Sequence, residues 1–374
     1  MILIYSDSDI IDREWIPNLK FPLPVQIVHS FLEYQSLSSD YKIAFTAHRL
    51  HCDHDANCPA YQGFEEKINL LSACSNLVFS LESELHNFHW YIWQQCHHDN
   101  VYWIQPGSVN DRDDMNSHII HWADFFKLVA RMYKHLPHKL NLLTDPYQPR
   151  KKYFDALLGS PKPHRTFVFN SVIQNNLQDK FIMTYGGKWN DNEFYAQDYF
   201  IWEPDCVPQQ KIIGTADYVL YDGYLTALSH VIPIDTFNST AYSIIAETDH
   251  DNTLSFYSEK TAKALVGRRL FVAFTGYKFL QNLRTLGFKT FDGIIDESYD
   301  LIKDDNQRYT QAFEQVKYLC NQPQEIILQQ AQPILEHNYD LIMNTDWTMY
   351  SVDRVQQQIN KIFVDIPVVP IVDA

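Results

Sequence analysis

Between residues 241 and 300, short apolar runs alternate with segments whose apolar residues recur at helical spacing. Residues 241–246 and 270–274 are apolar runs of strand length, and residues 288–291 have the pattern of a third strand. A helical pattern covers residues 261–264, and another places Leu280, Leu283 and Leu286 on one face before Gly287. Strands that alternate with helices predict an α/β sheet with crossover helices.

The first 145 residues show a similar alternation. Strand-like runs occupy residues 2–5, 41–45, 76–79 and 101–104, and helical patterns occupy residues 26–34, 64–71 and 117–136. Pro146 and Pro149 then mark a linker. We therefore expect one α/β domain over residues 1–145 and a second over residues 150–340. Residues 341–374 form a helix and tail that could return to the first domain.

Length and composition agree with a folded protein of two domains. The 374 residues are 45% apolar and include 11 glycines. The six cysteines lack close spacing and no signal peptide is evident, which favours reduced thiols in the cytoplasm. No apolar run approaches the length of a membrane span.

The formal charge of −16 argues against a protein that coats nucleic acid or an anionic membrane. A basic strip between His121 and Arg165 is the exception. Its members are Lys127, Arg131, Lys134, Lys139, Arg150, Lys151, Lys152, Lys162 and Arg165. The strip could serve the diphosphate of a donor or a polyanionic acceptor, or it could be a solvated linker surface.

Charged residues open the predicted helix that follows the strand at residues 241–246. Ser258 is a suitable N-cap, so Glu259 and Lys260 lie where the helix meets the carboxyl end of the sheet. Ligands of α/β sheets bind at this edge, and helix N–H groups there favour phosphate. Lys260 could neutralise a phosphate and Glu259 could accept hydrogen bonds from a ribose diol. The alternative is an ordinary helix start with one solvated ion pair.

Several segments in order resemble the donor domain of the α1,3-fucosyltransferase family. Glu247-Thr248, then residues 256–260 (FYSEK), then residues 270–276 follow the family's order of Glu-Asn, aromatic-x-Thr-Glu-Lys and a small-residue strand ending in Gly. Upstream, residues 161–165 (PKPHR) and 184–187 (TYGG) match a turn with an Arg and a Gly-rich turn. The PHR, GFKTFD and DESYD segments also resemble glycosyltransferase-like proteins of phages and marine microbes.

The resemblance covers residues 150–320 and implies a nucleotide-sugar enzyme of the GT-B class. Such a fold has two Rossmann-like α/β domains that face each other across a cleft. The implied chemistry is inverting and needs no metal. Donor contacts are implied for Arg165, Glu247, Phe256, Glu259, Lys260, Tyr185 and Gly186. The family's Asn is Thr248 here and its hydroxylated aromatic residue is Phe256, which changes base and sugar recognition.

Two residues of this set have sequence arguments of their own. Arg165 lies in the first turn of a predicted helix, and its fork can bind two diphosphate oxygens at once. Pairing with Asp155 is the structural alternative for Arg165. Glu247 follows a strand end, and the resemblance implies that it orients the donor sugar.

A second acidic pair follows the strand at residues 76–79. Glu82 and Glu84 would stand at its carboxyl end, where an acceptor hydroxyl needs a general base. His86 is a neighbour that could tune or replace them. Alternatively, these residues cap a helix.

Two clusters could bind metal, but neither has a convincing ligand set. Residues 48–58 contain His and Cys without the second pair that a zinc site needs. Asp296, Glu297 and Asp300 could coordinate a cation, and we interpret them as a loop and helix cap. We expect no metal and no cofactor besides the nucleotide-sugar donor.

The sequence thus predicts a glycosyltransferase that acts on a glycan hydroxyl. Three alternatives stay open: a DNA glycosyltransferase acting on a hydroxymethylated pyrimidine, a non-catalytic nucleotide- or glycan-binding module, and a phosphorylase or hydrolase of the same architecture.

Overall fold

The structure, a computed structural model, describes residues 1–48, 59–82, 96, 98–111, 117–159, 161–185, 211–212 and 218–363. The chain divides into two compact units, the first formed by residues 1–124 and 346–374 and the second by residues 125–345. Each contains a parallel sheet with helices packed on it, as in Rossmann-like domains. The division falls at Asp124, earlier than the proline-rich segment at residues 144–150 that we interpreted as the linker.

Unit 1 is built on a six-stranded parallel sheet in the order β2-β1-β3-β4-β5-β7. Its strands are β1 (Ile2–Ser6), β2 (Val25–Val28), β3 (Tyr41–His48), β4 (Leu77–Glu82), β5 (Val101–Gln105) and β7 (Ile119–His121). The remaining elements are β6 (Gly107–Val109), η1 (Ile11–Trp15), η2 (Ile16–Asn18), α1 (Phe31–Ser36), α2 (Pro59–Cys74) and α13 (Trp347–Lys361).

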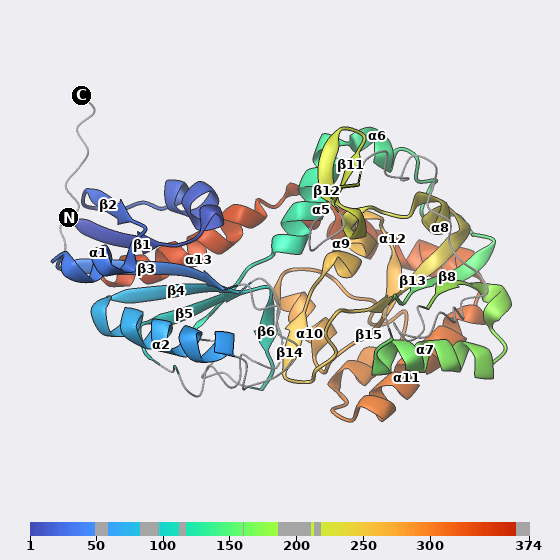
Figure 1. The fold of residues 1–374 in the computed structure, drawn as a ribbon. Coiled ribbons are helices and arrows are strands. Elements are labelled where there is room, and N and C mark those ends of the chain that lie inside the picture. The colour runs from blue at the N-terminus through green and yellow to red at the C-terminus, as the bar shows by residue number, and fades with distance from the viewer. Residues whose placement is uncertain are drawn as a thin grey trace. The chain divides into compact units, whose positions relative to one another are not determined.

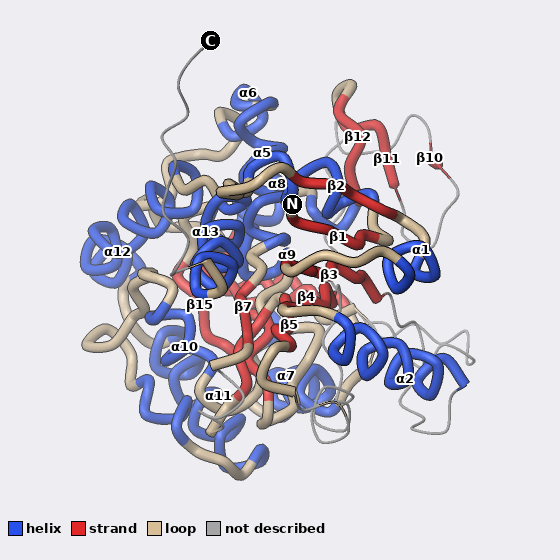
Figure 2. The backbone as a smooth tube through the Cα atoms, turned by 90° about the vertical axis from the view of Figure 1, so that its left-hand side faces the viewer, coloured by secondary structure: helices blue, strands red, loops and turns tan. Residues whose placement is uncertain are grey.

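The alternation of side chains along each strand decides which helices cover the faces of the unit 1 sheet. On one face, Ile2 and Ile4 pack in a single apolar cluster with Trp15 of η1 and with Val355 of α13. Ser351 of α13 also donates a hydrogen bond to the carbonyl oxygen of His121 at 3.0 Å. The last described helix is therefore part of unit 1 (Figure 2).

Unit 2 has a four-stranded parallel sheet in the order β15-β13-β8-β9. Its strands are β8 (Lys152–Leu157), β9 (Phe181–Thr184), β13 (Thr240–Ala246) and β15 (Leu270–Phe274). The helices are α5 (Asp124–His135), α6 (Pro137–Leu140), α7 (Pro163–Gln174), η3 (Gln178–Lys180), η5 (Leu228–His230), α8 (Ile234–Ser239), α9 (Glu259–Val266), α10 (Phe279–Thr285), η6 (Glu297–Leu301), α11 (Asp305–Cys320) and α12 (Gln324–Asn344).

Helices lie on both sides of the unit 2 sheet. Helices α7 and α11 lie on one side, and α8, α9 and α12 lie on the other (Figure 1). A separate antiparallel ribbon contains β10 (Lys211–Ile212), β11 (Tyr218–Tyr221) and β12 (Tyr224–Ala227). Asp222 and Gly223 both have positive φ, which suits the two-residue turn between β11 and β12. Strand β14 (Leu254–Phe256) precedes α9.

Three sequence-based elements were wrong. Residues 119–121 form β7 rather than the start of a long helix, because they pair with β5 at the sheet edge. Residues 25–28 form β2 rather than part of a helix, because they pair with β1. Residues 288–291 form no strand; Phe288 instead packs edge-on against Phe126 at 5.3 Å between ring centroids. Of the helices described, none has both the length and the apolar character needed to cross a membrane.

Candidate functional site

The unit 2 sheet has a topological switch point between β8 and β13. From β8 the chain crosses through α7 to β9 on one side, whereas β13 and β15 lie on the other side. Helices α7 and α9 follow β8 and β13 and begin near the carboxyl ends of these parallel strands. Open α/β sheets bind their ligands outside such strand ends.

The start of α7 is attached to the end of β13. Pro163 occupies the first helical position, where its fixed φ suits a helix start. Arg165 is buried in the first turn and donates from Nη2 to the carbonyl oxygen of Glu247 at 3.1 Å. The Nε2 atom of His164 lies 2.9 Å from the same oxygen. These contacts hold a cation at the switch point.

Asp155 pairs with Arg269, not with Arg165 as the structural alternative had it. The distance from Arg269 Nη2 to Asp155 Oδ1 is 2.9 Å, and both side chains are about 5% exposed or less. Arg269 also donates to Thr240 Oγ1 at 2.7 Å, to the Tyr242 carbonyl at 2.8 Å and to Ser243 Oγ at 3.1 Å. Burial raises the pKa of Asp155, and the guanidinium opposes this shift. The pair ties β15 to β8 and β13.

The predicted helix start at Ser258 is confirmed. Its side chain accepts a hydrogen bond from the Lys260 N–H at 3.2 Å, and α9 begins at Glu259. The Lys260 ammonium lies 2.7 Å from Glu259 Oε1 and 3.1 Å from Thr248 Oγ1. Its side chain keeps 23% of its surface exposed. Lys260 is therefore accessible, while its position is held by neighbouring oxygens.

Glu247 lies inside the structure rather than on its surface. It has no exposed surface, and its carboxylate accepts hydrogen bonds from the Ser258 N–H at 3.1 Å, from Ser258 Oγ and from Thr261 Oγ1. A carboxylate beside a helix N-terminus is favourable electrostatically. The carboxylate therefore holds the start of α9, and the sugar contact that the resemblance implies stays a prediction.

The glycine that ends the matched strand permits a close backbone approach. A Cβ atom at Gly276 would lie 2.2 Å from the carbonyl oxygen of Asp251. Only glycine fits at this distance. Gly276 thus lets the loop between β13 and β14 pack against the end of β15.

Two other expected donor contacts have side chains that are largely buried. Phe256 is 4% exposed and packs edge-on against Phe125 at 5.7 Å between centroids. Tyr185 is 8% exposed, donates or accepts a hydrogen bond with Thr166 Oγ1 at 2.7 Å and stacks on Phe169. Gly186 lies outside the described residues. The donor roles of these residues stay predictions.

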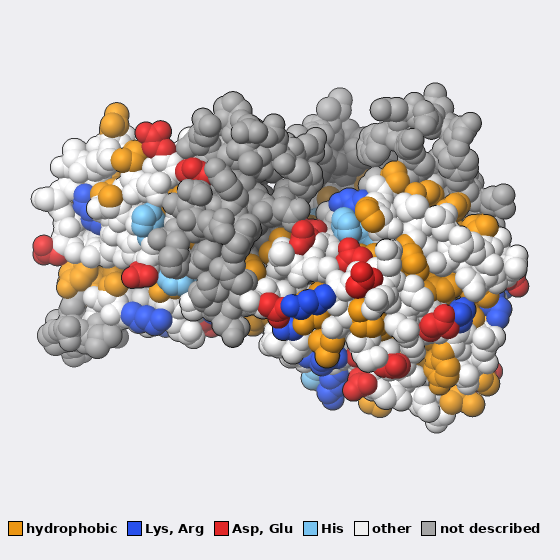
Figure 3. Space-filling model, turned by 90° about the horizontal axis from the view of Figure 1, so that it is seen from below, with side chains coloured by type: hydrophobic (Ala, Val, Ile, Leu, Met, Phe, Trp, Pro, Cys, Tyr) orange, Lys and Arg blue, Asp and Glu red, His pale blue; other side chains and the backbone are white. Residues whose placement is uncertain are grey.

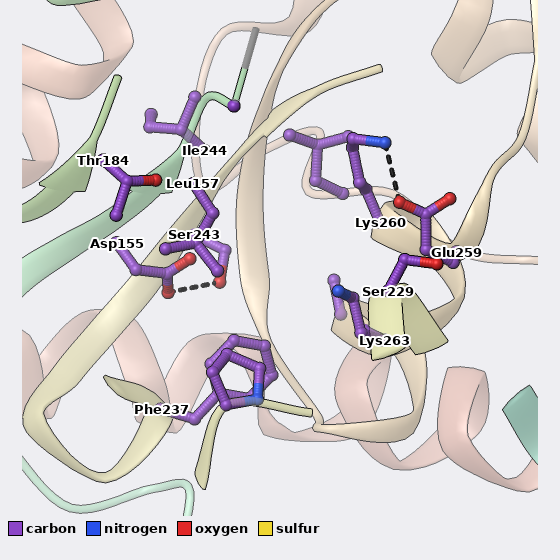
Figure 4. Close-up of a pocket in the computed structure, with 14 residues that line it drawn as sticks. Asp155, Leu157, Thr184, Ser229, Phe237, Ser243, Ile244, Glu259, Lys260 and Lys263 are labelled. Atoms are coloured by element: carbon purple, nitrogen blue, oxygen red, sulfur yellow. Dashed lines mark hydrogen bonds and ion pairs between the residues drawn. The ribbon is translucent and has the colours of Figure 1, made fainter. Parts of the chain in front are cut away.

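A cavity of about 300 Å³ lies between the sheet and α9. Its sheet wall carries Asp155 and Ser243, and its helix wall carries Glu259, Lys260 and Lys263 (Figure 4). Further lining comes from Leu157, Gly159, Thr184, Ser229, Pro233, Phe237, Ile244, Ile245 and Ala264. Its lining therefore combines the charged residues at the start of α9 with apolar residues such as Leu157 and Ile244 of the strands.

Neighbouring charges and burial shift the pKa values of Glu259 and Lys263 in this cavity. Burial alone would raise the pKa of Glu259, but Lys260 and Lys263 outweigh it and lower the pKa to about 2. Burial lowers the pKa of Lys263 to about 8, against the opposing effect of Glu259. At neutral pH Glu259 is therefore a carboxylate and Lys263 is mostly an ammonium group.

The expected catalytic base lies largely outside the described part of the chain. Glu82 is the last residue of β4, paired in register with His48, and only its backbone is described. Glu84, His86 and residues 49–58 of the His/Cys cluster lie outside the described residues. Their proposed chemistry stays a prediction.

The acidic cluster at residues 296–300 acts locally, as a loop and helix cap. Asp296 accepts from the Ser298 N–H at 2.9 Å and caps η6. Glu297 accepts from the Phe291 N–H at 2.7 Å and from Arg284 Nη1 at 2.9 Å. Asp300 accepts from the Leu280 N–H at 2.8 Å. The three carboxylates thus serve different partners.

Part of the basic strip also binds oxygens of its own chain. Arg150 donates to the Thr144 carbonyl at 3.2 Å, and Lys152 donates to the Phe181 carbonyl at 2.8 Å. Lys139 is only 6% exposed. On the described part of the face in Figure 3, basic and acidic side chains are interspersed. Fewer cations are left for phosphate than the sequence suggested.

Sequence reasoning missed Lys263, Arg269 and His164. Lys263 stands three residues after Lys260, which predicts a shared helix face. Ser229 and Phe237, which line the same cavity, come from a distant segment with no recognisable motif.

Comparisons with known proteins provide no further guide: no family model, curated protein or solved structure matches this chain.

Proposed function

We propose that the protein is a glycosyltransferase that binds a nucleotide-sugar donor at the switch point of unit 2. The observation that carries this proposal is the paired helix start: α7 and α9 begin beside the ends of β8 and β13, and each presents a cation in its first turn. Helix N-termini and cations together favour a diphosphate. In the finer form of the proposal, the two units are the domains of a GT-B enzyme.

The roles follow from chemistry and placement. Lys260 and Arg165 neutralise the diphosphate, on which charge develops as it leaves. Glu259 is ionised and is the first residue of α9, where it can accept hydrogen bonds from a ribose diol. Glu247 stabilises this helix start by accepting a hydrogen bond from the Ser258 N–H. The acceptor is a glycan hydroxyl in this proposal, with Glu82 or Glu84 as its base.

Replacement of Lys260 or Arg165 by Ala should weaken binding of nucleoside diphosphates by about 1.5–3 kcal/mol, the range for hydrogen bonds to charged groups. Isothermal titration calorimetry with UDP, GDP, CDP and ADP measures this loss. Lys289→Met is the control, because Lys289 is an exposed residue of unit 2 that does not line the cavity. Full affinity in both Ala variants would remove the donor assignment.

Arg165 needs a check on folding, because its side chain also binds the end of β13. The Lys260 side chain is more exposed than that of Arg165, so Lys260→Ala is less prone to disturb folding and is the better test. Circular dichroism should show the parental secondary structure for both variants before their affinities are compared.

Replacement of Glu82 or Glu84 by Gln should lower sugar transfer by about a hundredfold in one of the two variants, the scale of a general base. Donor affinity should stay near the parental value, because unit 2 holds the donor. Release of nucleoside diphosphate is measured with and without acceptor. Parental turnover in both variants, with a dead His86→Ala variant, would move the base to His86.

The DNA alternative predicts something different in the same assay. Transfer to hydroxymethylated DNA would depend steeply on salt, since phosphate contacts release counterions. The engaged Arg150 and Lys152 favour the glycan acceptor.

A further inference from the structure

Lys263 is a buried cation without a partner among the described residues. It is 9% exposed and lines the cavity, and its ammonium group makes no hydrogen bond or ion pair with any residue that the structure describes. Figure 4 shows its side chain on the helix wall, across the cavity from Asp155 and Ser243. Buried charges are normally paired, because an ammonium group loses its hydration on burial. The nearby groups do not supply that pairing.

The neighbouring charges leave the cavity positive. Glu259 is the strongest acidic influence on Lys263, but its Oε1 atom is already bound to the Lys260 ammonium at 2.7 Å. Asp155 on the opposite wall is matched by Arg269. Glu247 also acts on Lys263, and it lies beside Arg165. Four cations (Lys260, Lys263, Arg165 and Arg269) thus face three carboxylates (Glu259, Asp155 and Glu247), which leaves one positive charge without a carboxylate.

The other walls of the cavity indicate what kind of molecule would carry a negative charge to Lys263. Leu157, Pro233, Phe237 and Ile245 provide apolar surface, and Thr184 and Ser229 are polar lining residues. A volume of about 300 Å³ is at the lower end of small-molecule sites, which are mostly apolar with a few placed polar groups. Such walls suit the C–H faces and hydroxyls of a sugar ring better than a bare inorganic ion.

We propose that this cavity binds a sugar-sized molecule whose anionic group, a carboxylate or a phosphate, pairs with the Lys263 ammonium. This cavity shares Glu259 and Lys260 with the proposed donor site, but Lys263 has no role in the proposed diphosphate binding, so the inference is tested on a different residue. It predicts a ligand class for unit 2 even if sugar transfer is not the reaction.

The test compares three sugars on three proteins. Glucuronate, glucose 1-phosphate and glucose are titrated into the parental protein, Lys263→Met and the control Lys289→Met. We expect at least one anionic sugar to bind the parent and the control alike, and to bind Lys263→Met at least tenfold more weakly. Glucose should bind all three proteins weakly. Preference for glucuronate identifies a carboxylate, and preference for glucose 1-phosphate identifies a phosphate.

Three results would overturn the proposal. One is that neither anionic sugar binds the parent; another is that Lys263→Met keeps parental affinity. The third is that inorganic phosphate binds as tightly as glucose 1-phosphate while glucuronate does not bind, since the sugar would then contribute nothing. Nucleoside diphosphate binding, measured on the same samples, reports separately on the proposed function. Loss of anionic-sugar binding with intact nucleoside diphosphate binding would contradict only the role of Lys263, and the reverse result would contradict only the donor assignment.

Thermal unfolding separates a ligand-binding lysine from a structural one. Methionine fills a similar volume without a charge to bury, so Lys263→Met should unfold at the parental temperature or higher. A fall in Tm would mean that Lys263 stabilises the fold through a partner, which contradicts the proposal. Lys263→Arg retains the charge and should recover part of the anion affinity. An equal loss in Lys263→Arg and Lys263→Met would also count against a role for the charge.

Discussion

Replacement of Arg269 by Ala is expected to lower the free energy of unfolding of unit 2 by about 3–5 kcal/mol. The change leaves the Asp155 carboxylate buried at 3% exposure without its guanidinium partner. It also removes the donor to Thr240, Tyr242 and Ser243, so two strands of the sheet lose a shared contact. Denaturation with urea, followed by circular dichroism, measures the loss.

A double variant shows whether the cost comes from the orphaned charge. Asp155→Leu with Arg269→Met removes both charges and keeps apolar volume, so it should recover most of the stability that Arg269→Ala loses. If the double variant is as unstable as Arg269→Ala, the loss comes from the guanidinium's hydrogen bonds to the strand carbonyls and not from Asp155.

Replacement of Glu247 by Ala should lower the free energy of unfolding by about 2–5 kcal/mol, because each unsatisfied buried donor costs about 1–3 kcal/mol. The Ser258 N–H and the Thr261 hydroxyl would lose their acceptor. The start of α9 would then be less ordered, so nucleoside diphosphate affinity should fall together with stability. Calorimetry and denaturation on one preparation test both effects.

Glu247→Gln is the matched comparison, because its amide oxygen keeps one acceptor at the same position. We expect a smaller loss of stability than in Glu247→Ala. A Glu247→Ala variant with parental stability but no donor binding would instead assign the carboxylate to the ligand, as the fucosyltransferase resemblance implies.

Strong local patterns predicted the core strands and the helix start that form the site. The apolar runs at residues 241–246 and 270–274 lie in β13 and β15, and Ser258 caps α9. These features depend on neighbours in sequence. Residues 119–121 and 288–291 were misassigned because their state depends on distant partners, an edge pairing with β5 in one case and a contact with Phe126 in the other.

The chemical roles of the site residues could be predicted from the sequence only in part, for the same reason. Arg165, Glu259 and Lys260 were found from their position at helix starts, which a sequence records. The burial of Glu247, the pairing of Asp155 with Arg269 and the unpartnered Lys263 depend on which segments face one another across the sheet. No spacing rule connects Lys263 to Phe237, although both line one cavity.

The place of α13 in the core of unit 1 sets an order for folding during synthesis. Ile2 and Ile4 are translated before unit 2, yet the apolar cluster that buries them also contains Val352, Val355 and Ile359. All of unit 2 is translated between these two sets of residues. A nascent chain can therefore complete unit 2 while one face of the β1 sheet still lacks its covering helix, and that face is open to chaperones or to other chains until α13 has emerged from the ribosome.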